Sequence, residues 1–447
     1  MSLRATVLLS LLATALFTAL LIGTEQWGVG RHVDDGSVRY KFLLEDVSDR
    51  YIYQQRGRWL PSGRTPYLQE HSEYPQLSTW LFGLPYLFFD HHVPEGRAQR
   101  DIEFRQHEDD TAAYFDVHHV SMGLSLFALA ALTAACLVRL RASAGWALLL
   151  FLPGTVYFAF NRFDAWPAVF VALAVWQQLR GRRKSAAVAL ALGAMMKWYP
   201  ILLLPMFLAQ NLYEQRTSAT GGGVWWRHLP RAVIAPGLAA TAAMAAILGI
   251  TWFWDGGGWE AVSYVYQHHA DRPPNPPSLV YALRSPERWS WVPRGMARGI
   301  ESLLPALQFA PALVLALFPV RSRRALLLGA LCVVLGFAQF GKVFSPQWVC
   351  WVAPLAILLA PRSRLCLALV VLLQLLIYVQ IPVLYYERMG VPGASLNGAS
   401  GFWAVCDLRI ALLFTFWAWS LVAFLRTVWR GEDTPGSEPT PMPTVAT

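Results

Sequence analysis

The chain alternates between long apolar runs and short loops rich in arginine. The first run, residues 5–23, follows Arg4 and is long enough to cross the hydrocarbon core of a membrane, which takes about 20 apolar residues. Backbone groups inside a bilayer must satisfy their own hydrogen bonds, so repeated runs of this kind predict an all-α polytopic membrane protein with about twelve transmembrane helices. The further runs are 118–138, 144–160, 163–179, 185–196, 199–213, 231–252, 301–320, 325–341, 347–360, 365–384 and 405–425.

Composition supports this class. Apolar residues make up 55% and charged residues only 15% of the 447 residues, whereas soluble domains are about 45–50% apolar and about 25% charged. A cleaved signal peptide is the alternative for 5–23, but the run exceeds the usual core of about 7–15 residues and no good cleavage site follows it. The net charge of +9 does not indicate nucleic-acid binding, because the basic residues cluster in short loops. The five cysteines form no CxxC pair, and we expect small core residues rather than disulfides or zinc ligands.

The arginine-rich loops also predict orientation, because short basic loops stay on the cytoplasmic side of a membrane. Both chain termini then face the cytoplasm. The long loops 24–117 and 253–300 face outward, with four further segments at that face. These segments are the tips 161–164, 197–200, 341–347 and 385–404. The basic loops are marked by Arg139, Arg141, Arg180, Lys184, Arg321, Arg323, Arg324, Arg362, Arg364, Arg426 and Arg430.

We expect one transmembrane domain, residues 1–430, followed by a disordered cytoplasmic tail, 431–447, rich in proline, threonine and serine. The apolar stretch 74–90 cannot be a full span, because one more crossing would invert every later loop. It is therefore predicted to be a helix lying at the membrane surface within the first outer loop. The short runs 185–196 and 199–213 form either two short spans or a re-entrant pair that meets at residues 197–200.

Basic residues stand at the mouths of three apolar runs. Lys342 lies in the segment 341–347, Arg162 in 161–164 and Lys197 in 197–200. A charge at the edge of the hydrocarbon layer costs a few kcal/mol unless water or an anionic group meets it. This arrangement predicts a pocket for a negatively charged group that is embedded in the membrane.

The outer loops carry the candidate catalytic residues. Asp49 precedes Tyr53 and the predicted surface helix, and a carboxylate held at the membrane surface can act as a general base toward a hydroxyl group. Arg272, after the adjacent histidines 268–269, suits a phosphate contact because guanidinium binds phosphate oxygens in a bidentate manner. The chain has no phosphate-binding glycine loop, no GxGxxG, no HExxH and no GxSxG, which argues against a nucleotide as direct substrate.

Four motifs carry a resemblance to a known family. They are SDRYIYQQ at 48–55 with PYLQEHSEYPQL at 66–77, FNRFDAWPA at 160–168, MMKWYPILLLP at 195–205 and GKVFSPQWVCWVAP at 341–354. Together they resemble the GT-C superfamily of membrane glycosyltransferases, and within it glycosyltransferase family 87, which uses polyprenyl-phosphate mannose. The matches extend from about residue 48 to residue 354, and the C-terminal spans match in hydropathy alone. One departure is Gln76, where the family usually has a second proline.

The resemblance implies a GT-C fold and an inverting transfer of a sugar, mannose being the first expectation, from a polyprenyl-phosphate donor. The acceptor would be a lipid-linked or cell-envelope glycan outside the cytoplasmic membrane. Asp49 would be the catalytic base, with Asp46 as the second choice, and Lys342, Arg272 and Lys197 would neutralise the lipid phosphate. No cofactor is implied, and a divalent cation is possible but not indicated. The residues expected to contact substrate are Tyr53, Glu73, Tyr74, Arg162, Asp164, Lys197, Tyr199, His269, Arg272, Lys342, Ser345 and Gln347.

Two other classes explain part of the pattern. A secondary transporter also has about twelve spans and charges within the membrane. Against a transporter, the first outer loop is very long, the charges gather at one face rather than at the midplane, and no inverted repeat is visible. A lipid flippase or assembly scaffold would explain a pocket for an anionic lipid but not the acidic outer loop.

Overall fold

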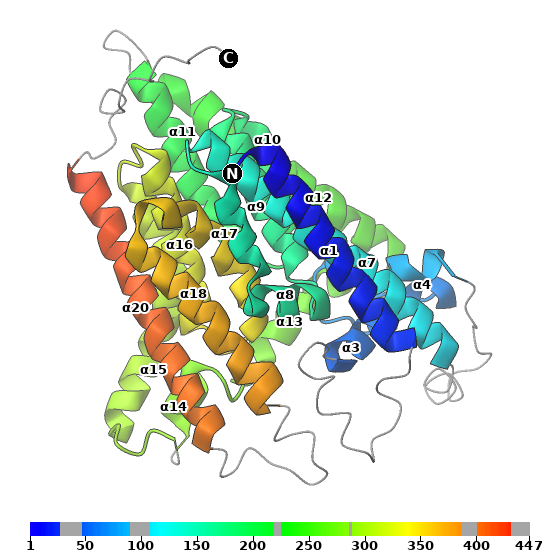
Figure 1. Cartoon of the computed structure of the whole chain (residues 1–447). Helices are drawn as coiled ribbons and strands as arrows, with labels where there is room; N and C mark the ends of the chain where they lie inside the picture. The colour runs from blue at the N-terminus through cyan, green and yellow to red at the C-terminus, as the bar shows by residue number, and fades with distance from the viewer. Residues whose placement is uncertain (27–46, 90–107, 219–224, 286–287, 386–399, 431–447) are drawn as a thin grey trace.

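The computed structural model describes residues 1–26, 47–89, 108–218, 225–285, 288–385 and 400–430, and every regular element in them is a helix (Figure 1). The prediction of an all-α protein is confirmed for this part of the chain. The predicted residue Asp46 and the tail 431–447 lie outside the described residues.

The N-terminal half comprises α1 (Leu3–Gln26), α3 (Val47–Gly57), α4 (Trp59–Ser62), α5 (Gln76–Gly83), η1 (Leu84–Leu87), α7 (Glu108–Arg139), η2 (Ala144–Phe151), α8 (Pro153–Asn161), α9 (Ala165–Leu179), α10 (Arg183–Ala194), η3 (Tyr199–Leu203) and α11 (Leu204–Ser218). The C-terminal half comprises η4 (Trp225–His228), η5 (Pro230–Ile234), α12 (Ala235–Trp254), α13 (Trp259–Asp271), α14 (Leu279–Arg284), α15 (Arg294–Val314), η6 (Leu315–Leu317), α16 (Arg323–Phe340), η7 (Pro346–Trp348), α17 (Val349–Leu359), η8 (Ala360–Arg362), α18 (Arg364–Tyr378), η9 (Val379–Tyr385) and α20 (Ser400–Arg430).

Seven helices among the described residues are long and apolar enough to cross a membrane, and a bent pair raises the number to eight. The protein is therefore a multi-pass α-helical membrane protein. The remaining predicted spans also fall on helices, but these are short, as in the 15 residues of α9 and the 11 of α17. Twelve spans stay a prediction. The seven are Leu3–Gly23, Thr111–Arg139, Pro230–Trp254, Arg294–Leu317, Arg323–Phe340, Arg364–Tyr385 and Ser400–Arg430.

Burial divides the long helices into central and peripheral ones. In α16, 83% of the most apolar window is buried, against 22% for α1. A helix that is apolar all round and buried belongs to the middle of a bundle, whereas an apolar helix with an exposed face needs lipid to cover it. The core thus lies around α16 and α17, and α1, α12 and α15 lie at the periphery.

The predicted run 144–160 is not a straight helix. It consists of η2 and α8, which meet at an angle of 66°. The break has a local cause, because Leu152 precedes Pro153 and adopts the extended backbone that a residue before proline prefers. Proline then starts α8 at its first turn, where a missing N–H costs nothing. The bend directs the C-terminal end of α8 toward the candidate site.

The arginine-rich connections gather at one end of the bundle, as predicted. Arg323 and Arg362 donate to the backbone oxygens of Arg139 and Leu140, at the C-terminal end of α7, over 3.5 and 3.4 Å. The N-terminal amine donates to the Ser143 hydroxyl in the same connection. Figure 1 shows α3, α13 and α14 at the opposite end, which we call the site end. The other end is called the arginine-rich end.

The runs 185–196 and 199–213 form a helical hairpin made of α10, η3 and α11. A guanidinium nitrogen of Arg183, at the start of α10, lies 3.1 Å from a carboxylate oxygen of Glu214 near the end of α11. Both ends of the hairpin therefore lie together, and Lys197 is at its tip. The 12 residues of α10 rise only about 18 Å, less than the roughly 30 Å of a hydrocarbon core.

The predicted surface helix is present as α5 with η1. Its N-terminal turn is fastened to the tip of the hairpin, since the Leu77 amide donates to the Met195 oxygen over 2.9 Å. The Ser78 hydroxyl donates to the Met196 oxygen over 2.7 Å. These contacts fasten the segment that follows Tyr74 to the segment that precedes Lys197. The position of α5 at a membrane surface stays a prediction.

Candidate functional site

The Asp49 carboxylate lies in the first turn of α3 and faces the end of α8. The backbone leaves the helix at Arg162, which is extended, and its side chain turns toward α3. The Arg162 Nε lies 2.8 Å from the Asp49 Oδ2, and the Tyr53 hydroxyl donates to the same oxygen over 3.5 Å. The Asp49 side chain keeps 25% of its surface exposed. It is therefore an accessible carboxylate whose charge is balanced by a nearly buried guanidinium.

A second carboxylate, that of Asp164, lies two residues after Arg162 in the chain and is completely buried. The Lys197 Nζ lies 3.6 Å from its Oδ1. The ammonium also lies over the rings of Phe163 at 4.7 Å, Tyr74 at 5.8 Å and Trp351 at 6.0 Å. A buried cation is stabilised by both a carboxylate and aromatic faces. Lys197 thus sits in an aromatic box that one carboxylate closes.

The segment 341–347 supplies the third wall. The Gln347 Oε1 accepts from the Arg162 Nε over 3.3 Å and from the Ser345 hydroxyl over 2.7 Å. Behind it, the Tyr199 ring stacks on Trp351 with 4.2 Å between ring centroids. Gln347 therefore links Arg162, which faces Asp49, to the loop 341–347 that contains Lys342.

Lys342 itself lies at the outer edge of this loop. Its ammonium donates to the Ala270 backbone oxygen at the end of α13 over 2.6 Å. Asn275 fastens the same loop twice through Phe344, donating to its oxygen over 2.6 Å and accepting from its amide over 2.8 Å. The loop and the end of α13 thus form one structural unit. Arg272, at the C-terminal cap of α13, is exposed.

His269 joins α13 to the segment before α5. Its Nε2 lies 3.0 Å from the Glu73 oxygen, and because a carbonyl can only accept, this nitrogen carries the proton. Burial, together with the positive charges of Lys197, His268 and Arg272, lowers the pKa of His269 from 6.5 to about 4. The imidazole is therefore neutral at pH 7, which argues against a role as a cation for phosphate.

Glu73 and Tyr53 have mainly structural partners. The Glu73 carboxylate pairs with the Arg56 Nε at 2.6 Å, which ties the segment before α5 to α3. The Tyr53 ring is completely buried, stacks on Phe82 at 4.5 Å and meets Phe163 edge-on at 5.5 Å. These aromatic rings form the floor under Asp49.

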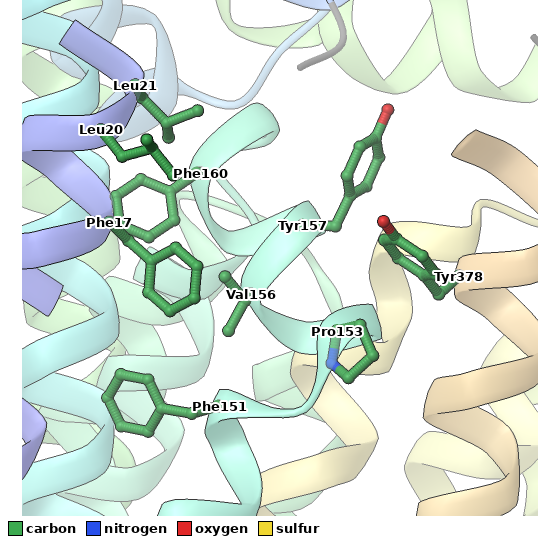
Figure 2. Close-up of a pocket in the computed structure, with 9 residues that line it drawn as sticks. All are labelled: Phe17, Leu20, Leu21, Phe151, Pro153, Val156, Tyr157, Phe160 and Tyr378. Carbon is green, nitrogen blue, oxygen red and sulfur yellow. The ribbon is translucent and has the colours of Figure 1, made fainter. Parts of the chain in front are cut away.

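An apolar groove lies beside the site, between α1, α8 and α18, with a volume of about 290 Å³ (Figure 2). Its lining residues are Phe17, Leu20, Leu21, Phe151, Pro153, Val156, Tyr157, Phe160 and Tyr378. Gly154 lets α8 approach α18, because a Cβ there would lie 2.3 Å from the Gln374 oxygen.

The groove has a polar end. In Figure 2 the hydroxyls of Tyr157 and Tyr378 point toward the upper end of the view, where Leu20 and Leu21 of α1 lie on the opposite side of the groove. That is the site end of the bundle (Figure 1). Tyr157 is on α8 five residues before Arg162, and the Asn161 side-chain amide donates to the Tyr157 backbone oxygen over 2.8 Å. The groove therefore extends from apolar surroundings toward the charged site.

Most members of this cluster were predicted from the sequence, but three kinds of residue were not. The rings of Phe163, Phe82 and Trp351 were not singled out, because aromatic residues are common in apolar runs. Arg50, next to Asp49, and His119, at the start of an apolar run, were also missed. A polar residue within an apolar run is a signal that could have identified His119, whereas Arg50 lies in an outer loop and carried no such signal. The described residues contain no group of three or more histidine, cysteine, aspartate or glutamate side chains that could hold a metal ion.

No protein-family model matches the chain, and no curated protein sequence matches it.

Proposed function

We propose that this protein is a membrane glycosyltransferase that transfers a sugar, mannose being the first candidate, from a polyprenyl-phosphate donor to a lipid-linked or cell-envelope glycan. The observation that carries the proposal is the pairing of an accessible carboxylate, Asp49, with the nearly buried guanidinium of Arg162 at 2.8 Å. A base for a hydroxyl group and cations for a phosphate are thereby combined at one end of a membrane-spanning bundle. The motifs at residues 48–77, 160–168, 195–205 and 341–354, which resemble glycosyltransferase family 87, contribute to this same cluster.

The groove suits the hydrocarbon part of such a donor. Its walls are apolar along α1 and α8, and its polar end leads to Arg162. A long-chain lipid phosphate bound there would bury its hydrocarbon in the groove and direct its phosphate to the site end. Burial of apolar chain favours binding by about 0.8 kcal/mol for each CH2 group. The phosphate would then meet Arg162, Lys197 and Lys342.

The reaction follows from these charges. Asp49 removes the proton of the acceptor hydroxyl as its oxygen attacks the anomeric carbon from the face opposite the phosphate. The new C–O bond forms while the bond between the anomeric carbon and the phosphate oxygen breaks, and its electron pair leaves with polyprenyl phosphate. The configuration at the anomeric carbon is inverted. Cations at the phosphate stabilise the charge that develops there, and one such contact is typically worth several kcal/mol.

Arg162 connects the two parts of the site. In the absence of a donor it balances Asp49 and donates to Gln347. A phosphate near Arg162 would compete for the guanidinium, so that Asp49 becomes a better hydrogen-bond acceptor for the incoming hydroxyl. Because short arginine-rich loops stay on the cytoplasmic side of a membrane, we expect the site end to be at the outer face of the cytoplasmic membrane, where lipid-linked sugars and envelope glycans meet.

The test is sugar transfer in isolated membranes supplied with radiolabelled polyprenyl-phosphate mannose. Wild-type protein should generate a new labelled glycolipid or glycan, and Asp49→Asn should reduce its rate about 10²–10⁴-fold because the base is lost while the shape is kept. Glu260→Gln, which changes an exposed carboxylate of α13 at the same end of the bundle, is the matched control and should retain most of the rate. Movement of intact donor or free sugar across the membrane without a new glycosidic bond would instead identify a transporter or flippase.

A further inference from the structure

α3 carries a second charged residue beside the candidate base. Arg50 follows Asp49 directly, and successive residues of a helix point about 100° apart, so the two side chains face different neighbours. Asp49 faces α8, whereas Arg50 faces α7 and is completely buried. A guanidinium keeps its proton in proteins, so a buried arginine needs hydrogen-bond acceptors or anions around it.

One of these acceptors is a histidine. The Arg50 Nη1 lies 2.7 Å from the Nε2 of His119, which is also completely buried on α7. Because guanidinium only donates, the His119 Nε2 must accept, and the imidazole must be neutral with its proton on Nδ1. The guanidinium also lies over the Phe115 ring at 4.5 Å. A charged group of α3 is therefore fixed to α7 by a directional contact.

The neighbouring histidine of α7, His118, also contacts α3, through Tyr53. His118 stacks on Tyr53 with 5.7 Å between ring centroids. Tyr53 in turn donates to the Asp49 carboxylate over 3.5 Å. A further bond, from the Gln54 amide to the Thr111 hydroxyl over 3.1 Å, joins the next turn of α3 to α7. α3 is short, at 11 residues, and an isolated helix of that length is marginal in water, so its position depends on such contacts.

We propose that His119 is a positioning residue for the Asp49 carboxylate and acts through its hydrogen bond with Arg50. The contact fixes the rotation of α3 about its own axis, which determines whether Asp49 faces Arg162 and the incoming hydroxyl. An error of about 1 Å in the position of a catalytic group can cost about a hundredfold in rate. This inference rests on the proposed function only where Asp49 acts as the base, since the contact itself can be tested without any activity.

The first experiment is a double-mutant cycle on the full-length protein, measured as the midpoint of thermal unfolding in detergent. His119→Leu deprives a buried guanidinium of an acceptor, whereas Arg50→Met leaves only a neutral ring. We therefore expect His119→Leu to lower the midpoint more than Arg50→Met, and the double variant to be more stable than His119→Leu alone. If the change in unfolding midpoint of the double variant equals the sum of the two single changes, Arg50 and His119 do not interact.

The second experiment separates positioning from mere stability. At a temperature where all variants are folded, His119→Leu should lower kcat about tenfold or more while KM for the donor stays within about threefold. His119→Gln keeps an acceptor oxygen for Arg50 and should recover most of kcat. His268→Leu, an exposed histidine on α13, is the matched control.

The outcomes are distinguishable. An unchanged kcat in His119→Leu, or a His119→Gln variant as poor as His119→Leu, would overturn the positioning role. A raised KM with unchanged kcat would also overturn it, because His119 would then act in donor binding. If wild-type protein transfers no sugar at all, the proposed function fails, while the double-mutant cycle still decides whether the contact between Arg50 and His119 exists.

Discussion

The two ends of the bundle use the same residue, arginine, in opposite ways. At the arginine-rich end, Arg139, Arg323 and Arg362 are exposed, and the last two donate to backbone oxygens at the end of α7. At the site end, Arg56 and Arg162 pair with carboxylates at 2.6 and 2.8 Å. Arginines that only cap a helix end can face water. Arg162 is nearly withdrawn from water and is paired with a carboxylate, and that carboxylate, Asp49, is the candidate base.

The hairpin of α10 and α11 shows this difference within a single element. At its open end, the pair of Arg183 and Glu214 keeps 24% and 39% of the side-chain surface exposed. At its tip, the pair of Lys197 and Asp164 keeps only 19% and 0% exposed. Exposed pairs are worth about 0–1 kcal/mol, whereas breaking a buried pair costs about 3–5 kcal/mol because a charge is left uncompensated. The tip is therefore expected to be the energetically sensitive part.

The largest effect on stability is expected from Lys197→Met. This change leaves the buried Asp164 without its cation and should lower the free energy of unfolding by about 3 kcal/mol. The double variant Lys197→Met/Asp164→Asn should be less affected, since no uncompensated charge remains. Arg183→Met at the open end should cost no more than about 1 kcal/mol. The measurement is thermal unfolding in detergent. An equal loss of stability in Lys197→Met and Arg183→Met would contradict the claim that the tip is the more sensitive end.

A smaller effect, on donor binding, is expected from Lys342→Gln. If Lys342 neutralises the lipid phosphate, the change should raise the inhibition constant of free polyprenyl phosphate roughly 10- to 100-fold and lower kcat as well. Lys342→Arg should rescue only part of this loss, because guanidinium is broader than a compact ammonium. Unchanged inhibition with lowered stability would show that Lys342 serves only to hold Ala270, and Arg272 would become the better phosphate ligand.

His269 gives a moderate pH effect at the site end. Its pKa is lowered to about 4 in the fold, from 6.5. The unfolded chain therefore binds a proton that the native protein does not as the pH falls from about 6.5 to about 4, and native stability should decrease over that window. His269→Gln should flatten this part of the stability profile. The measurement is the unfolding midpoint between pH 7 and pH 4, and identical profiles would contradict the buried, neutral imidazole.

The smallest perturbation tests orientation alone. Cysteines placed at Ser290, near α14, and at Thr217, near the end of α11, replace exposed side chains and should leave transfer activity unchanged. An impermeant thiol reagent should label the first from outside intact cells and the second only after permeabilisation. Labelling of both from outside would mean that the two ends of the bundle do not lie on opposite sides of the membrane.

The features of the fold that depend on local properties of the chain were predictable. Hydropathy is local, so helices were predicted at nearly all the right runs, and the basic loops were correctly grouped at one end. The bend at Leu152 and Pro153 was missed, although the X-Pro signal was present. The number of spans is harder to predict, because short helices such as α17 owe their stability to packing against neighbours.

The partners of individual charges could not be predicted. Asp49 contacts a residue 113 positions later, and Arg50 contacts His119, which is 69 positions away. Such pairs depend on how α3 packs on α7 and α8, which no local pattern encodes. Glu73 was expected at the substrate, yet its carboxylate is paired with Arg56. The general location of the site was therefore predictable, whereas the division of its residues into reactive and structural groups needed the fold.

The most direct test of the proposed function is product stoichiometry with purified protein in proteoliposomes. Donor and acceptor lipids are supplied in known amounts, and both glycosylated acceptor and free polyprenyl phosphate are quantified over time. Glycosyl transfer predicts that the two products appear in equal amounts, and that neither appears with Asp49→Asn. Recovery of intact donor in the presence of folded wild-type protein and an extract of native acceptors, or equal product formation by Asp49→Asn, would contradict a reaction at this site.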